Sequence, residues 1–514
     1  MKEIAQETRA SASSLEKRIE VFEEVAPSVD EGPPPPELTI EQEKRLYRKI
    51  DIRLMPMLTA MYLVSFLDRG NIGNAKLQGI LSSLHMTSNQ FNIALTMYFI
   101  PYCLFECPAN LVLKRLRPSR WLPGITVAWG IIMVSMGFVK NYPQLVGTRL
   151  LLGVAEAGLF PGVIYYLSIW YPRYKLQYRI AVFWGAAASS GAFSGLLAFG
   201  ISFLSGTDGF LGWSWIFILE GLLTIVVGFI AFFVLFDFPD TATFLTPEER
   251  AYVIHKKSAC QWSMFSAPID LATEYDNSSV GEEEHFEPRH LIAAFTDWQV
   301  WLHVLVHTSI ITPVFGITLF LPSIINGFGF DTATTQLLTV PPYVFATILI
   351  IIFANISDRI KMRFPFVTIG HIMCLIGFSI NISPVSIGAK YLGTFFIVGG
   401  CYSAFPAVVA WLANNLSGQY KRGVGTAMQI GIGNFGGAVA SNIFRAQDAP
   451  RYVLGYGIML MYIGIGMIAV PIVVLNYRRI NARRDKAEAD GRVDYDPAEL
   501  RRLGDRAPDF RYTL

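Results

Sequence analysis

The sequence predicts an all-α integral membrane protein with twelve transmembrane helices in two six-helix halves. Only 16% of its 514 residues are charged, against roughly 25% in soluble proteins, and 52% are hydrophobic. The mean hydropathy is +0.40, and apolar runs of about 20 residues, long enough to cross a bilayer, recur along the chain. This composition excludes disordered, collagen-like and nucleic-acid-binding proteins, and the net charge of +2 indicates no polyanionic partner.

Twelve apolar runs are candidates for membrane spans. They lie at 54–80, 90–112, 121–139, 143–170, 179–203, 212–236, 299–323, 335–355, 364–384, 390–413, 422–444 and 453–476. A polar stretch separates the sixth run from the seventh, so we expect halves at 51–237 and 298–477 joined by a linker at 238–297. The remaining segments, 1–50 and 478–514, mix charges of both signs and are interpreted as flexible tails.

The distribution of Lys and Arg predicts the orientation. Sixteen of them lie in or beside the loops after the even-numbered spans and the linker, against five in the opposite loops. By the positive-inside rule, the even loops, the linker and both tails face the cytoplasm. No secretory signal opens the chain, so the first span is expected to direct insertion. We expect a multi-pass protein of the plasma membrane.

Ionisable residues inside the spans mark a candidate site. Asp68 and Arg69 lie about 21 Å into the first span, near mid-bilayer, where ionisable groups are costly unless paired or hydrated and are therefore usually functional. Alternatively, that helix ends earlier and the two residues form its extracellular mouth. Arg149 and Glu156 in the fourth span are seven residues apart on nearly one face, so they line a cavity or pair structurally near the helix end.

Polar residues in the second half are further candidates. Gln429 and Asn434 in the eleventh span are predicted to bind substrate, with hydrogen bonds between helices as the alternative. His303 and His307 in the seventh span share a helix face, which suits a proton relay, a substrate contact or packing.

Three segments carry a family resemblance. LDRGNIGNAKLQGI at 67–80, RLLLGVAEAGLFPG at 149–162 and GWSWIFILEG at 212–221 resemble the anion:cation symporter family of the major facilitator superfamily. Within that family the chain looks like the fungal allantoate permease branch, whose members take up allantoate, nicotinate, pantothenate, biotin and similar anions. The resemblance spans about residues 45–480 and leaves out the tails and the linker. It implies a secondary active transporter that takes up a small organic anion together with protons, by alternating access.

The resemblance also implies roles for single residues. Asp68 and Glu156 match the acids that take protons, and Arg69 matches the ligand of the substrate carboxylate. Arg149 matches the arginine that balances these acids, and Tyr102 matches an aromatic residue that faces substrate. Independently of the family, an incoming carboxylate would compete for Arg69 and weaken its hold on Asp68 or Glu156, so anion binding would favour protonation.

A basic cluster after the eighth span resembles the cytoplasmic gate of major facilitator proteins. Asp358 and Arg359 are the gating pair that this resemblance implies. The equivalent cluster after the second span, KRLRPSR at 114–120, lacks the acidic residue, so a gating pair is expected only in the second half.

Other classes of protein find no support in the motifs. The chain has no GxxxxGK[ST] loop for ATP, no HExxH, and five cysteines in no zinc or disulfide spacing, so we expect neither an enzyme nor a cofactor. Energy is then expected from an ion gradient. The expected partners are a small organic anion, protons and the lipid bilayer, with no nucleic acid, and the expected state is a monomer. A metabolite exporter of the same fold and a non-transporting nutrient sensor remain as alternatives.

Overall fold

The structure, a computed structural model, describes residues 38–171, 173–253, 288–417, 419–449, 451–490 and 503–514. These residues form helices joined by turns, and none of them is in a β-strand. The prediction of an all-α protein is therefore confirmed. Most of the predicted tail 1–50 and of the predicted linker 238–297 lies outside the described residues.

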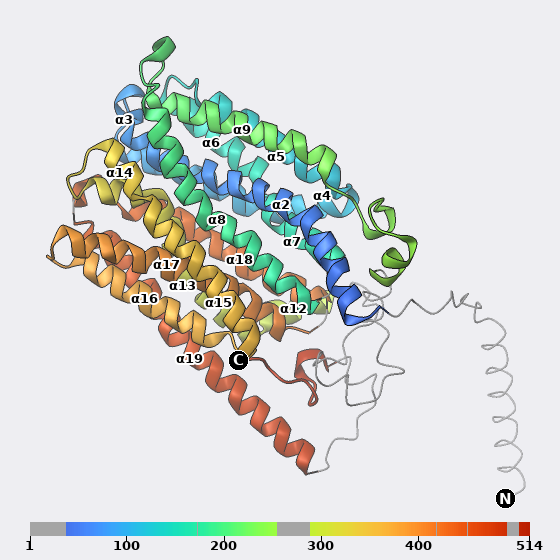
Figure 1. Ribbon diagram of the computed structural model, residues 1–514. Helices are drawn as coiled ribbons and strands as arrows, with labels where there is room; N and C mark the ends of the chain where they lie inside the picture. The colour runs from blue at the N-terminus through green and yellow to red at the C-terminus, as the bar shows by residue number, and fades with distance from the viewer. Residues whose placement is uncertain (1–37, 172, 254–287, 418, 450, 491–502) are drawn as a thin grey trace, which may run out of the picture.

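The helices fall into two groups in chain order. The first group consists of α2 (Ile40–Leu77), α3 (Ile80–Ser83), α4 (Ser88–Arg115), α5 (Pro118–Met136), α6 (Tyr142–Glu156), α7 (Leu159–Trp170), α8 (Arg173–Ser202) and α9 (Gly212–Val234). The second consists of α12 (Pro288–Thr296), α13 (Trp298–Asn326), α14 (Thr332–Leu338), α15 (Val340–Ile360), α16 (Phe364–Ile382), α17 (Ile387–Asn415), α18 (Gln419–Ile443) and α19 (Val453–Ala489). Figure 1 shows the first group, in blue to green, beside the second, in yellow to red.

Nine helical segments in the described chain are long and apolar enough to cross a membrane. Two of them combine neighbouring helices, because α6 leads directly into α7 and α14 into α15. Three other long helices, α4, α5 and α18, lie among these segments. The contacts of α4 with α6 and α18, and of α5 with α9, place all three within the same bundle.

Helix α2 is longer than the first predicted span. It begins after Thr39, whose side chain and that of Gln42 form a capping box that satisfies free backbone N–H groups. From there it runs without interruption through Asp68 and Arg69 to Leu77. The alternative in which a shorter helix leaves these two residues at an extracellular mouth is therefore wrong.

The two groups meet closely at the end of the molecule that carries α3 and α14 (Figure 1). A Cβ at Gly73 would lie 2.6 Å from the carbonyl oxygen of Leu319, so the approach of α2 to α13 requires glycine there. Beside this contact, Gln78 Nε2 donates to Gln336 Oε1 at 3.5 Å. Backbone packing and polar contacts thus join the two groups at this end.

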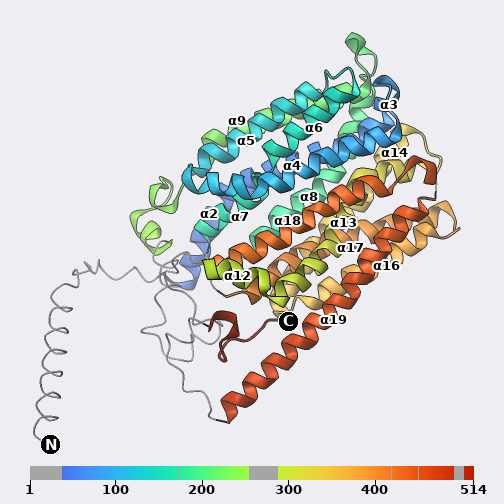
Figure 2. The same cartoon turned by 180° about the vertical axis from the view of Figure 1, so that it is seen from behind.

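The C-terminal region differs from the flexible tail that the sequence predicts. Helix α19 continues to Ala489, beyond the ends of its neighbours (Figure 2). Residues 503–514 then pack against the second group, where the ring of Tyr512 stacks on that of Tyr477 at 4.6 Å. Trp411 Nε1 donates to the carbonyl oxygen of Thr513 at 3.0 Å. For 503–514 the interpretation as a solvated, flexible tail is wrong.

Candidate functional site

Arg69 and Glu156 form a buried ion pair between α2 and α6. Arg69 Nη2 lies 2.6 Å from Glu156 Oε1, and the two residues are 5% and 1% exposed. Glu156 also accepts hydrogen bonds from Ser65 Oγ at 2.5 Å and from Tyr98 Oη at 2.5 Å. Three donors from two helices, α2 and α4, therefore hold this carboxylate, and the charge-assisted bond to Arg69 is the strongest type among them.

Aromatic rings surround the guanidinium of Arg69. Its Cζ lies 4.7 Å from the ring centre of Phe66, 5.1 Å from Tyr102, 5.4 Å from Tyr98 and 5.9 Å from Phe315. Phe315 belongs to α13, so both groups of helices contribute to this aromatic enclosure. Rings stabilise a cation without consuming its N–H donors. Arg69 Nε accordingly has no hydrogen-bond partner within the described residues.

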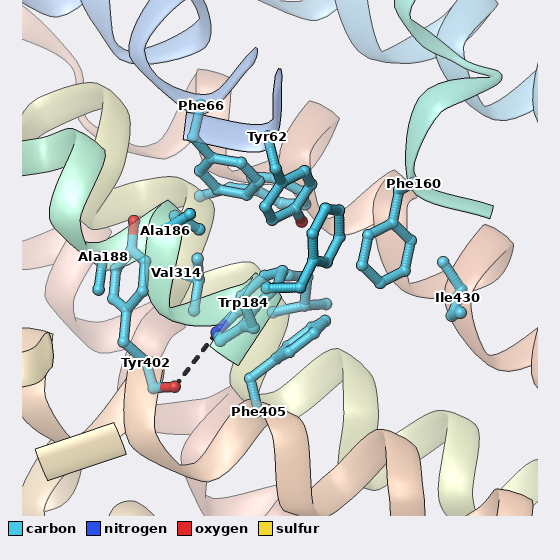
Figure 3. Packing of buried hydrophobic residues seen from close by; sticks show 14 of the residues in the cluster. Tyr62, Phe66, Phe160, Trp184, Ala186, Ala188, Val314, Tyr402, Phe405 and Ile430 are labelled. Atoms are coloured by element: carbon cyan, nitrogen blue, oxygen red, sulfur yellow. Dashed lines mark hydrogen bonds between the residues drawn. The ribbon is translucent and has the colours of Figure 1, made fainter. Parts of the chain in front are cut away.

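A layer of stacked aromatic side chains continues from this enclosure across the boundary between the groups (Figure 3). Trp184 of α8 stacks on Phe405 of α17 with ring centres 3.6 Å apart, and its Nε1 donates to the carbonyl oxygen of Tyr402 at 3.2 Å. On the other side of Trp184, Tyr62 of α2 stacks on Phe183 at 4.0 Å. The layer gives the site a flat, apolar wall next to its single ion pair.

Asp68 points away from this enclosure although it precedes Arg69 in the chain. Its Oδ2 accepts from Trp129 Nε1 of α5 at 3.1 Å and from Thr224 Oγ1 of α9 at 2.8 Å. Glu220, one turn before Thr224 on α9, accepts from Asn71 Nδ2. Adjacent helix positions lie about 100° apart, so Arg69 faces the boundary between the groups whereas Asp68 faces the interior of the first group.

Arg149 does not form the ion pair that its spacing from Glu156 permits. It is 2% exposed, and its Nε and Nη2 atoms have no hydrogen-bond partner among the residues that the structure describes. Residues seven apart on a helix are separated by about 10 Å along the axis, so a partner from another helix reaches the carboxylate more directly. Arg69 is that partner. The alternative in which Arg149 and Glu156 pair structurally is therefore wrong, and the role of Arg149 in balancing the charge of the acids stays a prediction.

The polar candidates of the second group lie mostly between helices. Gln429 Nε2 donates to the carbonyl oxygens of Val408 at 3.3 Å and His303 at 3.5 Å. These are hydrogen bonds between helices, the alternative to substrate binding that the sequence left open for Gln429. His303 Nε2 lies 3.1 Å from Tyr477 Oη. His307 is fully buried, and neither ring nitrogen has a hydrogen-bond partner in the described part of the chain.

Asn434 is the candidate in the second group that reaches the first. Its Nδ2 donates to Glu106 Oε2 of α4 at 3.1 Å. Glu106 is 5% exposed, and the sequence analysis did not single it out. The sequence alone could have identified Glu106 as a candidate site residue, because it is an acid inside the second predicted span, where ionisable residues are rare and usually functional.

The acid of the predicted gating pair forms its ion pair with a different arginine. Asp358 Oδ1 pairs with Arg363 Nη1 at 2.8 Å, whereas Arg359 is exposed. The chain reverses at Lys361, whose φ of 53° ends α15, and this turn returns Arg363 to the acid. Asp358 thus pairs with Arg363 and not with Arg359, and a gating role of Asp358 and Arg359 stays a prediction. No cluster of three or more His, Cys, Asp or Glu residues suited to a metal occurs within the described ranges.

Comparison with known proteins places this geometry in a family. Residues 58–441 match the model of the Major Facilitator Superfamily. An uncharacterized transporter of Schizosaccharomyces pombe is 33% identical, covering 92% of this chain and 90% of that protein. The high-affinity nicotinic acid transporter of Saccharomyces cerevisiae is 31% identical, covering 94% of this chain and 87% of its own length.

A solved structure with the same fold is that of a bacterial homolog of the human lysosomal transporter Spinster, in an inward-facing, occupied conformation. It is 14% identical, with a TM-score of 0.59, and the match covers 83% of this chain and 96% of that one. The fungal transporter relatives agree with the resemblance to the anion:cation symporter branch. The chain is not an enzyme but a multi-pass membrane transporter, and it belongs to the Major Facilitator Superfamily.

Proposed function

We propose that this protein takes up a small organic carboxylate together with at least one proton, across the plasma membrane. The observation that carries the proposal is the Arg69–Glu156 pair, which lies in an enclosure of aromatic rings from both groups of helices. Ionisable residues inside a membrane protein are usually functional, and the planar guanidinium of arginine suits a carboxylate. The nicotinic acid transporter among the relatives handles a carboxylate by its name, which supports the same class of cargo here.

The proposed architecture has twelve spans, with both tails and the linker in the cytoplasm and with halves at 51–237 and 298–477. Helices α4, α5 and α18 would complete the nine apolar segments as spans, because they pack inside the bundle. In this orientation the end that carries α3 and α14 faces outward. The halves would then rock around the enclosure to expose Arg69 to each side in turn.

Coupling follows from competition for one arginine. A substrate carboxylate that binds Arg69 displaces Glu156, which the structure places 2.6 Å from the guanidinium. A carboxylate that loses its cation in a water-poor site is costly as an anion, so Glu156 takes a proton. Binding of the anion and of the proton then favour one another by reciprocity. Glu156 is thus the first coupling acid, and Asp68 remains a second candidate that acts without touching Arg69.

Uptake of radiolabelled carboxylates tests the proposal. Cells without their own carriers express the protein and receive nicotinate, allantoate, pantothenate or biotin at about pH 5 and pH 7. We expect at least one anion to accumulate faster at the acidic pH, because protons are co-substrates. Arg69→Ala abolishes this uptake, while Arg511→Gln, whose guanidinium pairs with exposed acids, does not.

Two outcomes would contradict the proposal. Uptake of an anion with no dependence on external pH would exclude proton coupling. Efflux of a preloaded anion without uptake would favour an exporter, and the absence of any flux from a correctly folded protein would favour a sensor.

A further inference from the structure

Glu106 extends the enclosure toward the second group of helices. It lies four residues after Tyr102 on α4, so both side chains project from one helix face. Tyr102 borders Arg69 at 5.1 Å, and Glu106 follows about one helical turn further along the same face. This buried carboxylate is thus a neighbour of the anion site rather than an isolated polar residue.

The contact of Glu106 with Asn434 is part of a close junction between α4 and α18, which lie side by side in Figure 2. Further along the same junction, Asn442 Nδ2 donates to Thr96 Oγ1 at 2.8 Å. Glycine at 437 leaves room for the ring of Phe99. The junction fixes Glu106 and Asn434 relative to each other and to the enclosure.

Each of these two side chains keeps an acceptor oxygen available. Glu106 Oε2 is engaged with Asn434 Nδ2, but Glu106 Oε1 and Asn434 Oδ1 have no donor within the described part of the chain. Neither oxygen is among the fully buried polar atoms that lack a partner, so both retain accessible surface. No described Lys or Arg forms an ion pair with Glu106. A pair of open acceptors beside a cation site requires donors from elsewhere.

We propose that Glu106 and Asn434 form a second polar subsite, which accepts N–H or O–H groups of the transported anion. The inference rests on the proposed function and narrows its substrate class. Arg69 binds the carboxylate, the aromatic layer covers the apolar body, and the subsite binds amide, ureido or hydroxyl donors at the other end. The preferred cargo is therefore a carboxylate with separate hydrogen-bond donors, not a donor-free aromatic acid such as nicotinate.

Glu106→Gln tests this subsite without removing its contact to Asn434. The glutamine carbonyl still accepts from Asn434, but its –NH₂ group replaces an acceptor oxygen by a donor. A purely structural hydrogen bond would survive this exchange. The matched control is Glu488→Gln, which alters an exposed acid that pairs with Arg511.

The measurement compares uptake of pantothenate and allantoate, which carry donors, with uptake of nicotinate and benzoate, which carry none. The unaltered protein is expected to transport a donor-bearing anion with the lower KM. Glu106→Gln is expected to raise that KM about tenfold or more, because a hydrogen bond to a charged acceptor is lost, and to leave any nicotinate transport unchanged. Size-exclusion chromatography and cell-surface amounts confirm folding of each variant.

Three results would overturn the subsite. They are equal changes for donor-bearing and donor-free anions, no change for either, and a preference of the unaltered protein for donor-free anions. Each of these leaves carboxylate transport itself intact. If the unaltered, folded protein transports no carboxylate, the proposed function fails and the subsite fails with it.

Discussion

Two buried cations in this protein differ in how fully their N–H donors are used by carboxylates. In the second group of helices, Lys421 Nζ lies 2.6 Å from Asp297 Oδ2 and 2.7 Å from Asp505 Oδ1. In the first group, Arg69 has one carboxylate partner, Glu156, and its Nε has no partner in the described chain. One cation is shared by two acids, whereas the other retains donor capacity inside an aromatic enclosure.

The comparison suggests how a structural cluster differs from a binding site. In a binding site, the cation keeps N–H donors that no side chain of the protein uses. A saturated buried cluster has nothing to offer a ligand, and its loss leaves charges unpaired in the folded state. Arg69 is already desolvated and faces the boundary between the two groups of helices, so an incoming carboxylate finds its donors there with little competition from water. Substitutions in the first cluster are therefore expected to affect transport, and those in the second to affect stability.

The largest effect is expected at Arg69. Arg69→Ala removes charge-assisted hydrogen bonds to the substrate worth about 3 kcal/mol, so uptake falls about 100-fold or more. Arg69→Lys keeps the charge but loses the planar guanidinium and restores only part of the uptake. Initial rates of labelled-anion uptake, normalised to surface protein, check this. Full activity of Arg69→Ala would show that the substrate does not bind there.

A smaller loss is expected for Glu156→Gln. The variant keeps a hydrogen-bond acceptor near Arg69 but no longer exchanges a proton, so uptake at about pH 5 slows about tenfold and the difference between pH 5 and pH 7 disappears. Facilitated exchange of the anion persists, because the arginine is intact. The pH profile of exchange and net uptake checks this, with Glu488→Gln as the control. A preserved pH dependence would assign coupling to another acid, with Asp68 as the next candidate.

Lys421→Met should reduce stability without abolishing transport. It leaves Asp297 and Asp505 buried without their shared cation, at a cost of about 3 kcal/mol. A lower midpoint of thermal unfolding checks this. Combining Lys421→Met with Asp297→Asn and Asp505→Asn should recover part of the loss. Loss of uptake by folded Lys421→Met protein would contradict the division of roles between the clusters.

The smallest effect concerns Tyr512 at alkaline pH. Burial, followed by the charge of Asp505, raises the pKa of Tyr512 to about 12. A raised pKa means that the folded state favours the neutral phenol more than the unfolded state does. The contribution of Tyr512 to the free energy of unfolding is therefore complete below about pH 10 and is lost as the pH rises toward 12. Thermal midpoints of the unaltered protein and of Tyr512→Phe between pH 8 and 11 check this. Identical pH slopes for the two proteins would contradict it.

The helical fold and the residues of the ion pair follow from the sequence, because long apolar runs and intramembrane charges have strong physical consequences. The identity of the residue that pairs with Glu156 does not follow from the sequence. Periodicity shows which residues share a face of one helix, so it related Glu156 to Arg149, but it carries no information on which helix packs opposite. The contact with Arg69 depends on how α2 and α6 are placed relative to each other in the three-dimensional bundle.

Two further features of the structure cannot be predicted from the periodicity of the sequence. The C-terminal segment 503–514 has only a few apolar residues, and its attachment depends on partners in four different helices, α13, α17, α18 and α19. Glu106 is a single acid in an apolar run, and its significance depends on Asn434 from the other group. Long-range contacts define both features, and a local pattern does not encode them.

Proton uptake on anion binding tests the central claim most directly. Purified protein in weakly buffered detergent solution is mixed with the best transported carboxylate, and the pH is followed with an indicator dye. If the anion displaces Glu156 from Arg69, each binding event draws about one proton from solution and the pH rises, whereas Glu156→Gln binds the anion without this rise. Binding to the unaltered protein with no change in pH would contradict the claim.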